Sequence, residues 1–134
     1  MIDTEEWLAA WNSRDDDRIR ELCTPDVEVH AVALSVDARL YHGHEGVCRW
    51  LAEVRQRFQA RTKVETVTPI DDGAAVILGG RVHMTDETSG TPVETPFAIL
   101  AHLRDDRASW IGTFLTADEA RDAYSRGVTG RSTG

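Results

Sequence analysis

The sequence predicts an α+β fold, with helices in the first half of the chain and antiparallel strands in the second. Apolar residues recur at helical spacing three times before residue 60, and strand-like apolar patterns then fill most of residues 62–115. Turn signals at residues 71–73 and 105–106 separate the long strand patterns, so the strands can fold back on each other as hairpins.

The first helix is expected to begin at Thr4, whose hydroxyl can cap the helix. Trp7, Leu8 and Trp11 follow at helical spacing on one face. We expect this face to pack against the rest of the domain.

A short second helix begins with the acids at residues 15–17 and ends at Thr24-Pro25. Residues 26–31 then alternate between apolar and polar side chains, which predicts a strand with Val29 and Ala31 buried and His30 directed outward. Residues 32–41 are ambiguous and could continue this strand in a bent form.

The third helix has the clearest apolar stripe in the chain, and Gly43 and Gly46 flank its start. Charged side chains, Glu53 among them, are predicted to take much of the opposite, solvent-exposed face. The residues of the stripe are Val47, Trp50, Leu51, Val54 and Phe58.

Four further strands are predicted at residues 62–69, 74–85, 93–104 and 107–115. Gly79-Gly80 predicts a bulge or sharp bend within the second of them. Thr116 can cap a last short helix that runs through Tyr124, and the residues after it are expected to fray.

A two-residue loop at 105–106 fixes a testable strand register, because it places Arg104 opposite Arg107. The same register places His102 opposite Ser109. Both faces of this hairpin are apolar near its middle, so helices would cover one face and a partner subunit the other. The remaining predicted pairs are Phe97 with Phe114, Ile99 with Gly112, Ala101 with Trp110, Ala98 with Thr113 and Leu100 with Ile111.

The composition fits one domain of 134 residues with a formal net charge of -8. This charge argues against nucleic acid or an anionic membrane as the main partner. No signal peptide or membrane-spanning run is evident, and Cys23 and Cys48 lack a paired-motif spacing, so we expect a cytoplasmic protein with reduced thiols. The strong preference for Arg over Lys suggests a bacterial source.

Several short segments, in their order along the chain, resemble the SnoaL-like branch of the nuclear-transport-factor-2-like superfamily. They are the Trp-Leu-Ala-Ala-Trp-Asn run at 7–12, Leu22 followed by Pro-Asp-Val at 25–27, Tyr-His-Gly-His-Glu-Gly-Val at 41–47, and Thr-Phe-Leu at 113–115. The likeness covers about residues 4–125.

The resemblance implies a curved, mostly antiparallel mixed sheet that wraps around the N-terminal helices as a cone with a central pocket. It implies one such domain at residues 1–125, followed by a tail at 126–134. It also implies a homodimer through the outer sheet face, where we expect Phe97, Ile99, Trp110 and Phe114.

The family includes ketosteroid isomerases, polyketide cyclases, dehydratases and epoxide hydrolases, and the isomerase acid–base positions are changed in this chain. Trp7 stands where the isomerase has a tyrosine donor, and Ala31 and Ala98 stand where it has carboxylates. The last strand also lacks the carboxylate that a cyclase of this type would use. Isomerase chemistry of the usual kind is therefore disfavoured.

Histidine remains as the candidate acid–base group. The family mapping directs His102 into the pocket, as the acid or base, with Tyr41 and Trp7 as hydrogen-bond donors. Each has a purely structural alternative: His102 at a hairpin end bonded to Ser109, and Tyr41 as packing. The residues expected to line the pocket are Trp7, Trp11, Ala31, Trp50, Val54, Phe58, Leu78, Ala98, Leu100, Ile111 and Thr113.

The other histidines are expected to serve structure. His30 and His83 should point outward. His42 and His44, with Glu45, resemble a metal cluster but lack a convincing third ligand, so we expect His44 and Glu45 to cap or charge the start of the third helix.

The predicted function is binding of a small apolar or aromatic metabolite, with cofactor-independent and metal-free proton transfer as the chemistry if the protein is an enzyme. The alternatives are a non-catalytic binding protein and a pure dimerisation module.

Overall fold

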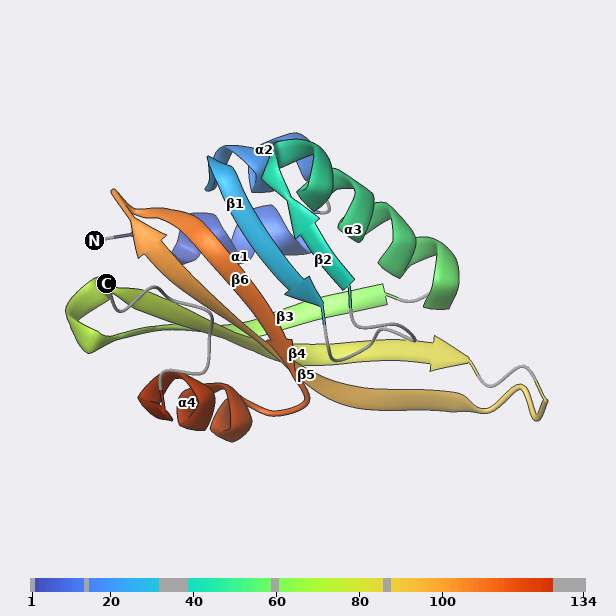
Figure 1. The fold of residues 1–134 in the computed structure, drawn as a ribbon. Coiled ribbons are helices and arrows are strands. Elements are labelled where there is room, and N and C mark those ends of the chain that lie inside the picture. Colours follow the sequence, from blue (N-terminus) through green and yellow to red (C-terminus); the bar gives the residue numbers. More distant parts are fainter. Residues whose placement is uncertain (1, 14, 32–38, 59–60, 86–87, 127–134) are drawn as a thin grey trace.

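A six-stranded mixed sheet forms the centre of the molecule, and helices cover both of its faces (Figure 1). The computed structural model describes residues 2–13, 15–31, 39–58, 61–85 and 88–126. The strand order is β2-β1-β6-β5-β4-β3, with β1 and β6 parallel and every other neighbouring pair antiparallel. The sheet does not close into a barrel, and this α+β arrangement confirms the predicted fold class.

The elements follow the predicted order, except that residues 39–42 form a separate strand antiparallel to β1 instead of continuing it. They are α1 (Thr4–Asn12), α2 (Asp16–Glu21), β1 (Cys23–Ala31), β2 (Arg39–His42), α3 (Gly43–Phe58), β3 (Arg61–Ile70), a 3-10 turn η1 (Asp71–Gly73), β4 (Ala75–Thr85), β5 (Pro92–Arg104), β6 (Arg107–Phe114) and α4 (Ala117–Arg126).

The helix caps differ in part from those predicted. Asp3, rather than Thr4, caps α1, because its carboxylate accepts hydrogen bonds from the backbone N–H groups of Glu5 and Glu6. The predicted cap of α4 is confirmed, since the Thr116 hydroxyl accepts a hydrogen bond from the Glu119 N–H at 3.1 Å. In each case a side-chain oxygen satisfies N–H groups that have no partner within the helix.

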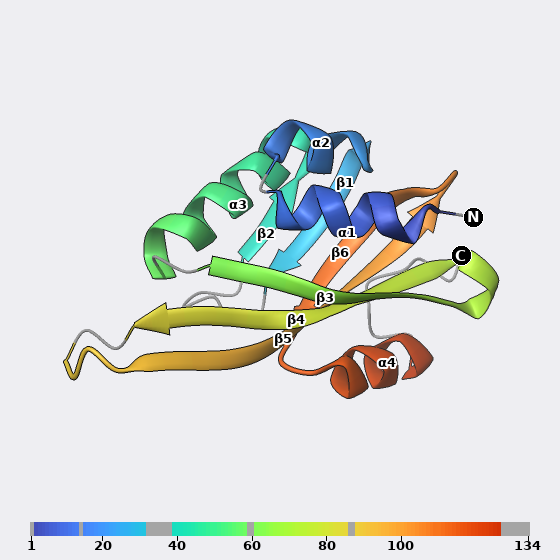
Figure 2. The same cartoon turned by 180° about the vertical axis from the view of Figure 1, so that it is seen from behind.

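The two sheet faces are covered by different helices (Figure 2). We call the face toward α1, α2 and α3 the inner face; it presents Val27, Val29, Val76, Leu78, Phe97, Ile99, Ala101 and Ile111. The outer face lies toward α4 and presents Ala75, Ile77, Ala98, Leu100, Trp110 and Phe114.

A bulge in the β5–β6 hairpin makes most of the predicted register wrong. Arg104 does pair with Arg107, but the register shifts between His102 and Leu103, so that His102 pairs with Trp110 instead of Ser109. The extra residue moves every later partner on β6 by one position. The pairs beyond the bulge are Ala101 with Ile111, Leu100 with Gly112, Ile99 with Thr113 and Ala98 with Phe114.

A second bulge lies in β3, and not in β4 at Gly79-Gly80 as predicted. The register between β3 and β4 shifts between Val64 and Thr66, whereas β4 pairs with β5 without interruption. At Gly80 a Cβ atom would overlap the carbonyl group of Lys63, so the glycine lets the two backbones approach closely. Alternation along β4 is therefore intact, and Ile77, Arg81 and His83 share the outer face.

Candidate functional site

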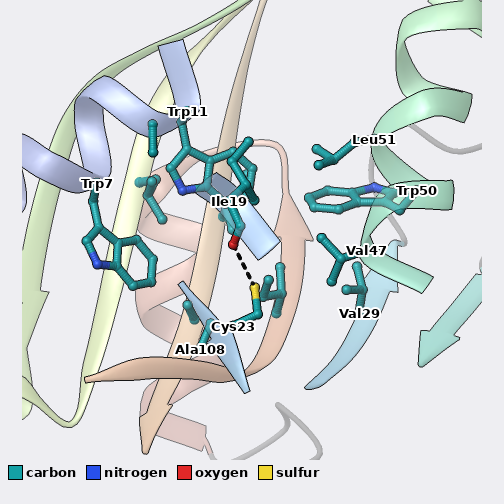
Figure 3. Close-up of a cluster of buried hydrophobic side chains, with 14 of the residues drawn as sticks. Trp7, Trp11, Ile19, Cys23, Val29, Val47, Trp50, Leu51 and Ala108 are labelled. Atoms are coloured by element: carbon teal, nitrogen blue, oxygen red, sulfur yellow. Dashed lines mark hydrogen bonds between the residues drawn. The ribbon is translucent and has the colours of Figure 1, made fainter. Parts of the chain in front are cut away.

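The inner side of the sheet carries three tryptophans, two from α1 and one from α3 (Figure 3). Trp7 is 2% exposed, and the rings of Trp11 and Trp50 meet edge to face at a centroid distance of 6.1 Å. Ile19, Val29 and Val47 pack with them, together with Cys23, whose thiol donates to the Ile19 carbonyl at 3.4 Å. All three rings are buried, so they form a large aromatic cluster against the sheet.

A tyrosine and a carboxylate lie beside this cluster. Tyr41 pairs with Val29 across β1 and β2, so its side chain shares the inner face. Its hydroxyl donates a hydrogen bond to the Glu53 carboxylate. Glu53 follows Trp50 by three residues on α3, so the pair stands about one helical turn from the tryptophan.

Sequence reasoning missed Glu53, because it placed this residue on the solvent-exposed face of the third helix. The structure shows Glu53 half-buried and bonded to Tyr41. Its spacing of three residues from Trp50 was the available signal, since such a residue stands beside the apolar stripe rather than opposite it.

Asn12 fixes α1 against the sheet. Its amide nitrogen donates to the Val64 carbonyl at 2.9 Å, and its amide oxygen accepts from the Val64 N–H at 2.8 Å. The side chain thus occupies the place of a strand neighbour at β3, the last strand of the sheet. This contact helps to hold Trp7 and Trp11 over the inner face.

His102 does not lie where the sequence placed it. It is 6% exposed and lies on the outer face, with its ring centroid 5.2 Å from that of Trp110 and 5.3 Å from that of Tyr124 on α4. The prediction that Ala98, Leu100 and His102 point toward the N-terminal helices is therefore wrong. Both faces of β5 are apolar, so alternation alone could not tell which of them the helices cover.

The predicted pocket residues divide between the two faces. Leu78 and Ile111 lie on the inner face with the three tryptophans, and Thr113 joins them through its pairing with Ile99. Ala98 and Leu100 lie on the outer face instead. The side chains of Ala31, Val54 and Phe58 lie outside the described part of the structure.

The four residues predicted to form a dimer contact cannot form one continuous surface. Phe97 and Ile99 are buried on the inner face, whereas Trp110 and Phe114 lie on the outer face beside α4. The β5–β6 bulge separates the two pairs, because it places Trp110 and Phe114 on the face opposite to Phe97 and Ile99.

The other histidines occupy separate places. His30 lies outward, as predicted, with its ring centroid 5.0 Å from that of Trp110. His83 is exposed beside Glu94, and His44 contacts the Cys23 carbonyl through Nε2 at 3.0 Å. Among the described residues, no group of three or more His, Cys, Asp or Glu side chains could hold a metal ion.

Asp26 and Cys23 are among the titratable groups whose pKa values are shifted. A hydrogen bond from Arg104 at 2.5 Å lowers the pKa of the exposed Asp26 to about 2. Burial raises the pKa of the Cys23 thiol to about 12, which keeps it protonated at neutral pH. Cys23 therefore packs with the tryptophans as a neutral group.

An open hollow of about 560 Å³ lies between α1 and α2. Charged side chains, including Asp3, Glu6 and Arg18, line it, and none of the predicted site residues does. In the described part of the chain, no helix is both long enough and apolar enough to cross a membrane.

Comparisons with known proteins agree with this fold. The model of the family described as "SnoaL-like domain" matches residues 4–111, and no curated protein matches the chain. Among solved structures, a putative SnoaL-like polyketide cyclase from Jannaschia is 21% identical with a TM-score of 0.64, covering 89% of this chain and 88% of its own.

Two further structures show the same fold. TerC, co-crystallised with polyporic acid, is 21% identical with a TM-score of 0.66, covering 88% of this chain and 92% of its own. A hypothetical protein with a ketosteroid isomerase-like fold from Catenulispora acidiphila, in complex with trimethylamine, is 16% identical with a TM-score of 0.63, covering 84% of each chain. At these identities the likeness shows the fold alone.

Proposed function

Because the chain belongs to the SnoaL-like domain family, we propose that it binds a small apolar or aromatic metabolite on the inner side of its sheet and converts it by proton transfer. The hydrogen bond between Tyr41 and Glu53, beside Trp50, is the observation that carries this proposal. The reaction class is a cofactor-independent isomerisation, cyclisation or dehydration.

The roles follow from the chemistry of the two groups. An ionised Glu53 can remove a proton from a carbon acid, and the Tyr41 hydroxyl can then donate a hydrogen bond to the oxygen on which charge develops. The tryptophans of α1 and α3 supply an apolar surface that orients a flat substrate. Glu53 thus provides a carboxylate in a chain that has Ala31 and Ala98 at the positions expected from the isomerase resemblance.

His102 and Tyr41 do not act on one substrate atom in this proposal, since the sheet separates them. The acid–base role of His102 stays a prediction, as do the homodimer and the cytoplasmic location. Crystals of related folds that contain polyporic acid or trimethylamine support small-molecule binding as the general role.

The experiment has two stages. Mass spectrometry of small molecules released from the purified protein identifies the ligand, and its turnover is then measured with wild type, Tyr41→Phe and Glu53→Gln. We expect each variant to lose about a hundredfold or more in kcat, which is the usual worth of a positioned acid–base group.

Glu45→Gln is the matched control, because Glu45 lies on the same helix in an exposed pair with Arg49. It should leave kcat unchanged. Ligand binding without turnover in the wild type would instead support the alternative, a non-catalytic binding protein, which the two alanines at the expected carboxylate positions favour. No released ligand, and no binding of flat aromatic probes, would leave the dimerisation module as the remaining alternative.

A further inference from the structure

Four aromatic rings form a row on the outer face, away from the proposed substrate. The row begins with His30 on β1, whose ring centroid lies 5.0 Å from that of Trp110 on β6. The Trp110 centroid lies 5.2 Å from that of His102 on β5, which in turn lies 5.3 Å from that of Tyr124 on α4. Trp110 lies flat over Gly112, where a Cβ atom would overlap its six-membered ring. Three strands and one helix thus bring two histidines, a tryptophan and a tyrosine together on the outer face.

Trp110 holds an unsatisfied hydrogen-bond donor. The residue is 7% exposed, and its indole N–H has no hydrogen-bond partner in the described part of the chain. A buried donor without an acceptor is rare and carries a cost in folding free energy, so it calls for an acceptor from outside the described residues. The proposed substrate does not provide one, since it lies across the sheet.

The charges around the row select against an anionic ligand. Glu28 is the β1 register partner of Trp110, and Asp71 accepts a hydrogen bond from the Tyr124 hydroxyl at 2.5 Å. A carboxylate placed among these acids would be repelled. A neutral oxygen can accept from the indole N–H without that penalty, and aromatic rings offer stacking surfaces to the body that carries it.

We propose that the outer face holds a second ligand site, between α4 and strands β1, β5 and β6, for a small neutral aromatic compound with a carbonyl oxygen. That oxygen accepts the hydrogen bond from the Trp110 N–H, and the rings of His30 and His102 flank the compound. Entry requires α4 to move. Ala120, Ala123 and Tyr124 hold this helix in place, and its displacement uncovers buried apolar residues of the outer face, including Ile77 and Leu100.

Three probes of similar size test the site: acetophenone, ethylbenzene and benzoate. Acetophenone carries a neutral hydrogen-bond acceptor, ethylbenzene carries none, and benzoate carries a negative charge. Each is titrated into the ¹⁵N-labelled full chain while the indole N–H resonances of the four tryptophans are followed. Single Trp→Phe variants at positions 7, 11 and 50 assign the Trp110 signal by elimination, so Trp110 itself can stay in place.

We expect acetophenone to shift the Trp110 signal in a saturable manner, with ethylbenzene and benzoate each about fivefold weaker or worse. Trp11 is the matched control, because its N–H is also buried and unpartnered but lies on the inner side. Its signal should not follow that of Trp110.

Three results would overturn the proposal. They are an unmoved Trp110 signal at saturating probe, equal binding of acetophenone and ethylbenzene, and an exchange contact between the Trp110 N–H and a long-lived water that persists with probe present. The last result would mean that a bound water alone satisfies the donor.

Discussion

The side chain of Asn12 is expected to contribute two hydrogen bonds that help to fix α1 on the sheet. Asn12→Ala removes both hydrogen bonds to Val64, whose own side chain is buried. Each bond contributes roughly 1 kcal/mol net, and alanine returns about 0.5 kcal/mol through its higher helix propensity. The variant should therefore lose about 1.5 kcal/mol of unfolding free energy.

Urea unfolding monitored by far-UV circular dichroism measures this loss, and the slope of the transition should stay unchanged. Ser13→Ala is the matched control: among the described residues its hydroxyl bonds only to the Ala10 carbonyl, which belongs to the same helix, so about 0.5 kcal/mol or less is expected. If Asn12→Ala is no less stable than Ser13→Ala, the two bonds to Val64 do not anchor the helix and the reasoning fails.

Three further predictions concern separate parts of the molecule. Gly112→Ala should cost about 1–3 kcal/mol, seen as a lower thermal midpoint, because the new methyl group overlaps the Trp110 ring; an unchanged midpoint would contradict the packing. The pKa of Asp26 is about 2 when folded and 3.8 ordinarily, so its pair with Arg104 stabilises the fold above about pH 4 and stops doing so as the pH falls toward 2. In an NMR titration, Arg104→Gln should raise the Asp26 pKa toward 3.8, and an unaltered pKa would exclude the pair as the cause. An aromatic disulfide reagent at pH 8 should label only Cys48 in the native chain, because burial holds the pKa of Cys23 at about 12; rapid labelling of two thiols would show otherwise.

The fold class and the order of elements could be predicted because they depend on local signals. Apolar spacing placed the helices, and the turn at residues 105–106 fixed the pairing of Arg104 with Arg107. Both loop residues have positive φ, 53° at Asp105 and 63° at Asp106, which suits the twist of a tight hairpin.

The candidate site was harder to predict, since it depends on which sheet face the helices cover. Ile99 and Leu100 are equally apolar, so the sequence of β5 does not distinguish its two faces. The bulge beside His102 has no glycine to mark it. Glu53 was misplaced because the third helix was divided into an apolar and a charged face, whereas a residue at their boundary can serve either side.

The bulge itself can be tested by deletion of Ser109, and the result distinguishes the two registers. In the structure Ser109 is the unpaired residue: Ala108 pairs with Leu103, and Trp110 pairs with His102. Its deletion should therefore remove the bulge, make the β5–β6 pairing continuous and leave His102 opposite Trp110. The only loss is the hydrogen bond that the Ser109 hydroxyl donates to the His102 carbonyl in the described structure. In the uninterrupted register, Trp110 pairs with Ala101, so deletion would carry it from one face to the other and create a contact with His102 that the wild type lacks. A nuclear Overhauser contact between the two rings in both proteins supports the bulge, whereas its appearance only after deletion means that the outer row of rings does not exist in the wild type.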